Sequence, residues 1–273
     1  MKIVLISCYF GELPWYYRFF LHSCSYNQTI DFIIVTDDQS NNSPKPKNVR
    51  IIYHTLEEIN GLFSERLGFP VSIQNGYKLC DFKPAYGFLF YDLILGYDFW
   101  GHSDIDVIFG NIRNFITNEV LQVSDVISVR PDYITGCFSL FRNCDKVTRL
   151  FMQSKDYKRV FSDSRHYGFD ETNFYHSDFS SGKRYDEIHS EIESMMHVVK
   201  RLENVGYIRP YFDLHIVEGR PGRLNWDKGI LMYRNKYEAL LYHLVKLKHV
   251  YNQKKTLRTM PDTFSITPTR ILA

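Results

Sequence analysis

Two aspartates separated by a single residue, Asp104 and Asp106, have the type and spacing that metal-assisted chemistry requires. In an extended segment, side chains two residues apart point to the same side of the backbone. Two such carboxylates can bind a divalent cation and, through it, a diphosphate. The cation then offsets the negative charge that develops as a nucleoside diphosphate leaves. Because chance supplies many pairs of this kind, the segments around the motif decide its meaning.

The flanks of the motif are apolar. Residues 98–102 are predicted to form a strand that ends at the motif, and the sequence Val-Ile-Phe-Gly follows it at 107–110. An unpaired carboxylate is costly in such a buried setting. The flanks therefore favour a binding function for the two aspartates over a solvated turn.

Alternating strands and helices must position this motif. The sequence predicts strands at 2–8, 31–36 and 49–53, a helix from Pro14 to about residue 24, and a helix near 56–67. This order is typical of a doubly wound, mainly parallel sheet. Ligands bind beyond the carboxyl ends of such strands, so three strand ends should share one edge. They are Ser7 to Gly11, Asp37-Asp38 and Asp104 to Asp106.

The remaining chain continues as an α/β domain without an internal repeat or a linker. A capping box of Thr55 and Glu58 predicts the start of the helix near 56–67. We further expect a helix at 81–95, strands at 126–130 and 137–142, mostly helical structure at 145–200, a strand- and turn-rich region at 208–235, and a basic helix or tail at 236–258.

The composition indicates a globular protein. Of 273 residues, 44% are hydrophobic and 23% are charged, and the net charge of +2 gives no bias towards nucleic acid. The five cysteines are dispersed, without metal-site spacing, and are expected to be reduced thiols. The first apolar run is too short for a signal peptide, and no run approaches the roughly 20 residues that span a bilayer. We expect a cytoplasmic protein, with peripheral contact to the inner face of the plasma membrane as an alternative.

Three sequence blocks carry a resemblance to a known family. They are 77–87 (YKLCDFKPAYG), 96–106 (GYDFWGHSDID) and 136–143 (GCFSLFRN). The chain resembles, from its first strand to about residue 250, bacterial GT-A-fold, DxD-containing glycosyltransferases of the capsule and exopolysaccharide type. The resemblance implies one GT-A-like domain over 1–273, with a mixed, mainly parallel sheet flanked by helices. Residues 1–145 would bind the nucleotide sugar, and 146–273 would form the acceptor side and a basic C-terminal tail.

The resemblance also implies roles for individual residues. Mn²⁺ or Mg²⁺ would be held by Asp104, Asp106 and His243, and the catalytic base would be Asp170 or Glu171, with Asp170 slightly preferred. The nucleotide-sugar donor would be contacted by Ser7, Cys8, Tyr9 and Gly11 at the nucleoside, Asp37 at the base or ribose, Lys78, Asp81 and Lys83 ahead of the motif, Gly136 at the donor sugar and Lys246 near the diphosphate.

Each of these roles has a structural alternative. Lys78 and Lys83 could be ordinary surface lysines, and Asp170 and Glu171 could merely begin a helix. The position of His243 on an apolar helical face would suit a core histidine. His215 is the rival metal ligand, His102 should pack against or orient the aspartates, and Trp226 should either stack on an acceptor sugar or pack in the core. A basic cluster would either meet anionic lipid or form a solvated helix face; it comprises Lys246, Lys248, His249, Lys254, Lys255 and Arg258.

The expected reaction is transfer of a hexosyl group from a nucleotide sugar to a hydroxyl of a cell-surface glycan or lipid-linked acceptor. A UDP-linked donor of the galactose or glucose type is favoured, and the acid pair favours inversion. Retention would turn these acids into positioning groups. A sugar nucleotidyltransferase is a rival, but residues 8–13 lack the glycine-rich, basic loop of that class. A non-catalytic carbohydrate-binding relic is a second rival, which the intact aspartate pair disfavours.

Overall fold

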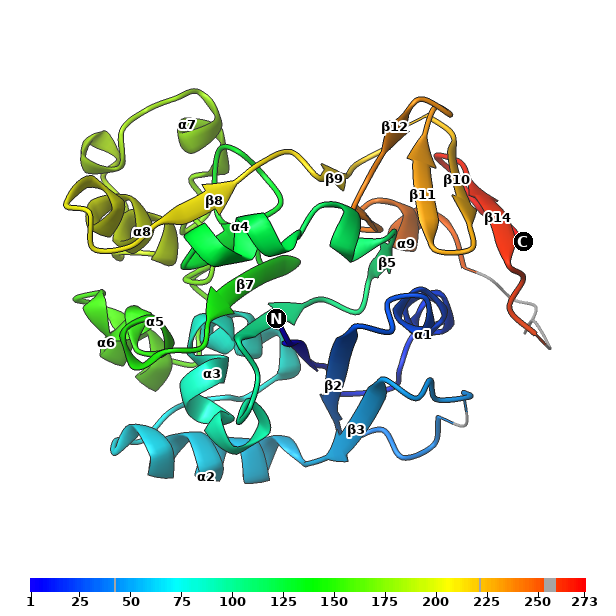
Figure 1. Ribbon diagram of the computed structural model, residues 1–273. Coiled ribbons are helices and arrows are strands. Elements are labelled where there is room, and N and C mark those ends of the chain that lie inside the picture. Colours follow the sequence, from blue (N-terminus) through cyan, green and yellow to red (C-terminus); the bar gives the residue numbers. More distant parts are fainter. Residues whose placement is uncertain (42, 221, 253–258) are drawn as a thin grey trace.

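The computed structural model describes residues 1–41, 43–220, 222–252 and 259–273 (Figure 1). Within these ranges the largest sheet has seven strands, in the order β3-β2-β1-β4-β7-β6-β8. Its strands are β1 (Ile3–Cys8), β2 (Ile30–Thr36), β3 (Val49–Tyr53), β4 (Phe99–Ser103), β6 (Val126–Ser128), β7 (Phe138–Arg142) and β8 (Pro210–Phe212).

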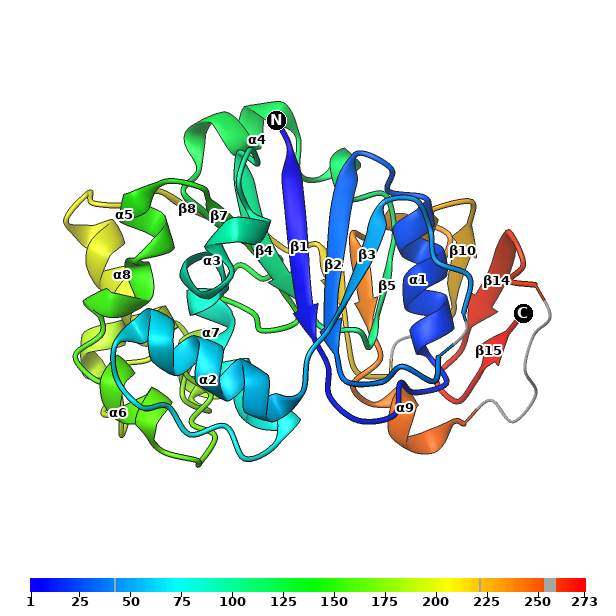
Figure 2. The same cartoon turned by 90° about the horizontal axis from the view of Figure 1, so that it is seen from below.

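The directions of these strands confirm the expected fold class. Strand β1 pairs in parallel with β2 and β4, β2 with β3, and β6 with β8. Strand β7 runs antiparallel to both β4 and β6. The sheet is therefore mixed and mainly parallel, with helices on its faces (Figure 2).

Strand β1 is buried on both faces, which explains its continuous apolar sequence. Its side chains alternate, so Val4 and Ile6 enter one core cluster while Ile3 and Leu5 enter the other. The first cluster includes α2 (Leu56–Leu67), and the second includes α1 (Tyr17–Ser25). The sheet thus holds two cores apart and leaves its carboxyl-terminal edge available for polar groups.

The helix α2 begins with the predicted capping box. Thr55 Oγ1 accepts from the backbone N–H of Glu58, and Glu58 accepts from the backbone N–H of Thr55 at 2.8 Å. It ends at Gly68, whose φ of 73° is readily available only to glycine. In the described part of the chain, no helix is long and apolar enough to cross a membrane.

The segment 81–95, expected as one helix, is broken. It contains the end of a 3₁₀ helix, η1 (Gly76–Ala85), the single turn α3 (Tyr86–Leu89) and η2 (Tyr91–Leu93). Pro84 cannot donate a backbone hydrogen bond, so it weakens an α-helix at this point. The acidic and basic side chains of η1 also turn inwards to polar partners, as described below.

The expectation of a basic helix or tail over 236–258 is wrong for its described part. This part contains β12 (Tyr237–Glu238), β13 (Leu241–His243) and only one helical turn, α9 (Leu247–Val250). Strand β13 pairs antiparallel with β5 (Val107–Phe109), which follows the aspartate motif directly. Tertiary strand pairing therefore overrides the local pattern. Lys254, Lys255 and Arg258 lie outside the described residues.

The other described strands form two smaller sheets, in the orders β5-β13-β9 and β12-β11-β10-β14-β15. The second sheet covers α1 through Phe19, Trp226 and Phe264 (Figure 1). Trp226 is buried and its Nε1 donates to the Phe109 carbonyl at 2.8 Å, so it packs in the core rather than facing a sugar. The strands are β9 (Ile216–Val217), β10 (Leu224–Asp227), β11 (Ile230–Tyr233), β14 (Thr263–Ile266) and β15 (Ile271–Leu272).

The region 145–200, predicted to be mostly helical, has about half of its residues in helices and covers one end of the large sheet (Figure 1). Its elements are α5 (Asp145–Thr148), η4 (Leu150–Gln153), α6 (Tyr157–Ser162), α7 (His176–Ser180), η5 (Tyr185–Glu187) and α8 (Met195–Asn204); η3 (Ile112–Asn114) and α4 (Asn118–Val123) precede it.

Candidate active site

A pocket of about 560 Å³ opens beyond the carboxyl ends of β1 and β4, where the sequence places its polar residues. This size suits a small ligand. The predicted site residues that line it are Cys8, Tyr9, Lys83, Asp104, Asp106, Gly136, Asp170, Glu171 and His243.

The predicted metal ligands come together at this pocket. Asp104, Asp106 and His243 each offer one ligand atom, and these atoms all lie within 4.8 Å of one another. The aspartates follow β4, and the antiparallel pairing of β13 with β5 brings His243 beside them. The backbone N–H of Leu244 donates to the Asp106 carbonyl at 2.8 Å and fixes this register. Two carboxylates and one imidazole form a donor set that suits Mn²⁺ and, with more oxygen ligands from water or phosphate, Mg²⁺.

Each aspartate also has a lysine partner. Lys83 Nζ donates to Asp104 Oδ1, and Lys248 Nζ donates to Asp106 Oδ2, both at 2.7 Å. Burial raises the pKa of Asp106, but contacts with His243 and Lys248 outweigh burial and hold that pKa below its ordinary value. For Lys83 both effects have the opposite sign. Burial lowers the pKa of Lys83, but the nearby Asp104, Cys80 and Asp170 raise that pKa well above its ordinary value. Asp106 is therefore held as a carboxylate, and each aspartate has an ammonium partner whose place a metal cation could take.

His243 lies between two carboxylates. Its Nε2 lies 3.5 Å from Asp106 Oδ2, while its Nδ1 lies 3.2 Å from Glu218 Oε1. Arg130 Nη1 donates to Glu218 at 3.0 Å and holds the glutamate in place. Glu218 thereby orients the ring so that Nε2 faces the aspartates. Glu218 was not predicted from the sequence, because no local motif marks a residue whose role is to orient a histidine on another strand.

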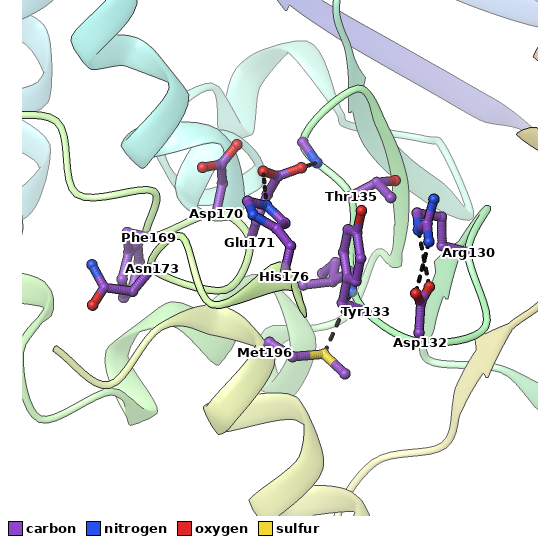
Figure 3. A network of polar contacts seen from close by, with 12 residues as sticks. Arg130, Asp132, Tyr133, Thr135, Phe169, Asp170, Glu171, Asn173, His176 and Met196 are labelled. Carbon is purple, nitrogen blue, oxygen red and sulfur yellow. Dashed lines mark hydrogen bonds and ion pairs between the residues drawn. The ribbon is translucent and has the colours of Figure 1, made fainter. Parts of the chain in front are cut away.

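The acidic pair Asp170 and Glu171 lines the same pocket, and Figure 3 shows Glu171 against His176. Glu171 accepts from the Gly136 backbone N–H at 2.6 Å and lies 3.0 Å from His176 Nε2. Asp170 Oδ2 lies 3.6 Å from Lys83 Nζ. Burial raises the pKa of Asp170 well above its ordinary value despite the charge of Lys83. Glu171 is thus a held carboxylate, whereas Asp170 has the raised pKa that suits a proton acceptor.

Gly136 brings the backbone close to these acids. A Cβ atom at this position would lie 2.5 Å from Asp170 Oδ2, a distance that no side chain permits. The Gly136 carbonyl accepts from Lys83 Nζ at 2.9 Å and from His102 Nδ1 at 3.1 Å. Burial lowers the pKa of His102 well below its ordinary value, so the ring is neutral. His102 therefore positions the Gly136 loop rather than the aspartates themselves.

Lys78 and Asp81 lie outside the pocket lining and form a buried ion pair of 2.9 Å. Lys78 Nζ also donates to the carbonyls of Val160 and Arg165, at 2.6 and 2.7 Å. Asp81 accepts from the backbone N–H groups of Tyr167 and Phe169, both at 2.9 Å. The pair expected to contact the donor is thus seen to anchor the loop that leads to Asp170.

The other predicted donor residues lie around the pocket rather than in its lining. Ser7 is buried and its hydroxyl lies 2.9 Å from that of Ser103. Asp37 accepts from the Gly11 backbone N–H at 2.7 Å and so holds the loop after β1. Lys246 is exposed, and the rival ligand His215 lies 3.8 Å from Asp213. Lining residues without a predicted role include Tyr16, Tyr77 and His166, and Lys248, expected in the basic cluster, lines the pocket as well.

The comparison with protein families gives a clear match. Residues 5–273 match the model described as "Family of unknown function (DUF6625)". The chain belongs to this family. No curated protein matches the chain.

Solved structures similar to this DUF6625 chain include three glycosyltransferases. The galactosyltransferase LgtC in complex with donor and acceptor sugar analogs is 13% identical, with a TM-score of 0.36, over 63% of this chain and 72% of that one. Mouse xyloside xylosyltransferase 1 is 10% identical, with a TM-score of 0.44, over 89% and 97%. GlyE of Streptococcus pneumoniae TIGR4 is 9% identical, with a TM-score of 0.31, over 74% and 43%.

Proposed function

We propose that this DUF6625 protein is a metal-dependent glycosyltransferase. The observation that carries the proposal is that one pocket contains both a group of possible cation ligands and a separate carboxyl group that could accept a proton. Asp104, Asp106 and His243 offer ligand atoms within 4.8 Å of one another, and Asp170 lies across Lys83 from them. The first group suits a cation and diphosphate, and the second suits proton removal from a hydroxyl.

Asp104, Asp106 and His243 would hold Mn²⁺ or Mg²⁺, which supplies positive charge to a departing diphosphate. Lys83 and Lys248 add ammonium groups at the same place. In the proposed inverting reaction, the acceptor oxygen forms a bond to the anomeric carbon of the donor. The carbon–oxygen bond to the diphosphate breaks, its electron pair stays with the diphosphate, and Asp170 takes the acceptor proton.

The finer parts of the proposal follow the resemblance to capsule and exopolysaccharide glycosyltransferases. The donor would be a UDP-linked hexose of the galactose or glucose type, and the acceptor a cell-surface glycan or lipid-linked saccharide. The protein would act in the cytoplasm, with peripheral membrane contact through its basic C-terminal segment. Lys246 and His249 are exposed in that segment, whereas Lys248 is turned to Asp106.

The test is nucleotide release by the purified protein from UDP-glucose, UDP-galactose and GDP-mannose, with and without Mn²⁺. We expect Mn²⁺-dependent release of UDP, and Mn²⁺-dependent UDP binding by calorimetry. The variants Asp104→Asn and Asp106→Asn should abolish both, while Asp145→Asn, an exposed acid at the start of α5, serves as the matched control. No release and no metal-dependent UDP binding would refute the proposal, and release of pyrophosphate from UTP and a sugar phosphate would favour a nucleotidyltransferase.

A further inference from the structure

A row of aromatic rings leads from the wall of the pocket to the protein surface. His166 lies in the middle, with ring centroids 4.5 Å from Tyr77 and 5.6 Å from Phe174. Tyr77 and His166 line the pocket together with Asp170 and Glu171. The outer rings are unusually open, since Tyr77 is 67% exposed and Phe174 60% exposed. Large exposed aromatic side chains gathered at a pocket mark a binding surface.

The backbone holds Phe174 in this exposed position at a cost. Asn173 and Phe174 have φ angles of 54° and 68°, a left-handed conformation that is rare for residues with a bulky side chain. Such strain persists only where the surroundings impose it. Gly168 leaves room for the Phe174 ring, because a Cβ atom at position 168 would lie 3.1 Å from that ring. The absence of a side chain at Gly168 gives the ring its place.

Several hydrogen bonds impose the strained turn. The Asn173 backbone N–H donates to the Gly168 carbonyl at 2.9 Å, and its side-chain Nδ2 donates to the Tyr167 carbonyl at 2.6 Å. Asn173 Oδ1 accepts from the Glu191 backbone N–H at 3.2 Å. Asp81, buried beside Lys78, binds the same loop at Tyr167 and lies 3.1 Å from His166 Nδ1. The ring row is therefore built on a fixed support rather than on a free loop.

We propose that Tyr77 and Phe174 form a platform for a neutral pyranose ring of the acceptor saccharide. This inference rests on the proposed function and names the side of the pocket that the acceptor uses. Pyranose rings have an apolar C–H face, which packs on flat aromatic surfaces, and polar edges, which need hydrogen-bonding groups. The ring contacts to His166 are edge-on, with interplanar angles of 65° and 75°, and both outer side chains stay more than half exposed.

Charge separates this platform from the donor side. Lys248, which suits a diphosphate, contacts Asp106, while Lys83 lies between Asp104 and Asp170. The platform instead adjoins Asp170 and Glu171 in the pocket lining, where an acceptor hydroxyl must meet the proposed base. Trp226, the aromatic residue that the sequence suggested for sugar stacking, is buried elsewhere. The platform is thus an acceptor subsite rather than a second donor subsite.

The test uses saturation-transfer NMR on the full chain with methyl β-D-glucopyranoside, methyl β-D-galactopyranoside and lactose, in the presence of UDP and Mn²⁺. We expect binding of at least one of these sugars, weakened about fivefold in Tyr77→Ala and in Phe174→Ala, since an aromatic contact contributes about 1 kcal/mol. Phe174→Tyr keeps the ring and should retain binding. Tyr237→Ala removes an exposed tyrosine on β12 and is the matched control.

Metal-dependent UDP binding, measured on the same samples, separates the two proposals. If it persists in the wild type and the sugars bind equally to all variants, or to none of the proteins, the platform is refuted and the proposed function stands. If UDP binding is absent from the wild type, the proposed function itself fails. Loss of UDP binding together with sugar binding in Phe174→Ala would also refute the platform, because it would show a general structural role.

Discussion

At the scale of single residues, two charged groups of the pocket each have more than one charged partner. Lys83 faces Asp104 and Asp170, and Asp106 faces Lys248 and His243. A ligand that replaces one partner of Lys83 or of Asp106 leaves the other partner in place, so neither of these two charges is left alone. The functional consequences can be measured one side chain at a time.

Glu218 should control metal affinity without touching the metal. Replacing it in Glu218→Gln removes the charge that orients His243, and such changes typically weaken metal binding by about 10- to 100-fold. Calorimetric titration with Mn²⁺ measures the effect, and Glu119→Gln, an exposed acid on α4, is the control. Unchanged Mn²⁺ affinity would show that the histidine needs no support from Glu218.

Asp170 and Glu171 should differ in their effect on turnover. Asp170→Asn is expected to lower kcat by a factor of about 10² to 10⁴, because the proton acceptor is lost while UDP binding is kept. Glu171→Gln should have a smaller effect on kcat, since its carboxylate is held by Gly136 and His176. Initial rates at saturating donor check this order, and the reverse order would assign the base to Glu171.

The His176–Glu171 pair predicts a pH dependence of stability. The hydrogen bond to Glu171 raises the pKa of His176 above its ordinary value of 6.5. The stabilisation is therefore fully present below pH 6.5 and is lost as the pH rises through the raised pKa. The NMR titration of His176 should shift downwards in Glu171→Gln, and the difference in unfolding free energy between wild type and His176→Gln should shrink between pH 6 and pH 9. An identical titration in both proteins would contradict the pairing.

At the scale of elements, η1 and the loop that follows α6 form one unit through the buried Lys78–Asp81 pair. Lys78 and Asp81 bind residues that lie more than 80 positions further along the chain, as the hydrogen bond from Lys78 to Val160 illustrates. This separation explains why the sequence suggested donor contacts for both residues. Local patterns did predict β1, β2 and the capping box of α2, because periodicity and capping act within a few residues.

Breaking this pair should destabilise the protein strongly. Asp81→Asn leaves the buried ammonium of Lys78 unpaired, which costs about 3–5 kcal/mol. Urea unfolding measures the loss. The double variant Lys78→Met/Asp81→Leu should recover part of this stability, and a loss below 1 kcal/mol for Asp81→Asn would contradict the role given to the pair.

The candidate site was partly predictable for the same physical reason. Asp104 and Asp106 are separated by one residue and directly follow β4, so their spacing alone suggested that they share a side. His243 was named by resemblance and placed on a helix, whereas it lies on β13, whose pairing with β5 is a tertiary event. Lys248, Glu218 and the ring row around His166 depend on such long-range contacts and left no local pattern.

At the scale of the whole molecule, the sheet β12-β11-β10-β14-β15 is joined to α1 and to β5 through Trp226. Trp226 stacks on Phe264 with centroids 4.9 Å apart, and it lies 4.9 Å from His22 of α1. Its Nε1 reaches the carbonyl of Phe109 on β5, the strand that follows Asp106. This sheet thereby supports β5, the strand that follows Asp106 and pairs with the strand of His243.

Trp226→Ala should therefore weaken both the fold and the site. Loss of a fully buried tryptophan costs about 3–5 kcal/mol of unfolding free energy. Denaturant unfolding and Mn²⁺ titration of the same variant measure the two effects. Tyr237→Ala in the same sheet, at an exposed position, should change stability by less than about 0.5 kcal/mol.

The lysine partners of Asp104 and Asp106 have a thermodynamic meaning for the order in which ligands bind. A divalent cation that takes these carboxylates competes with two ammonium groups that already neutralise them. The ammonium groups that the cation displaces regain an anionic partner only if a diphosphate binds. Cation and nucleotide should therefore bind with positive coupling, each raising the affinity of the other by the same factor.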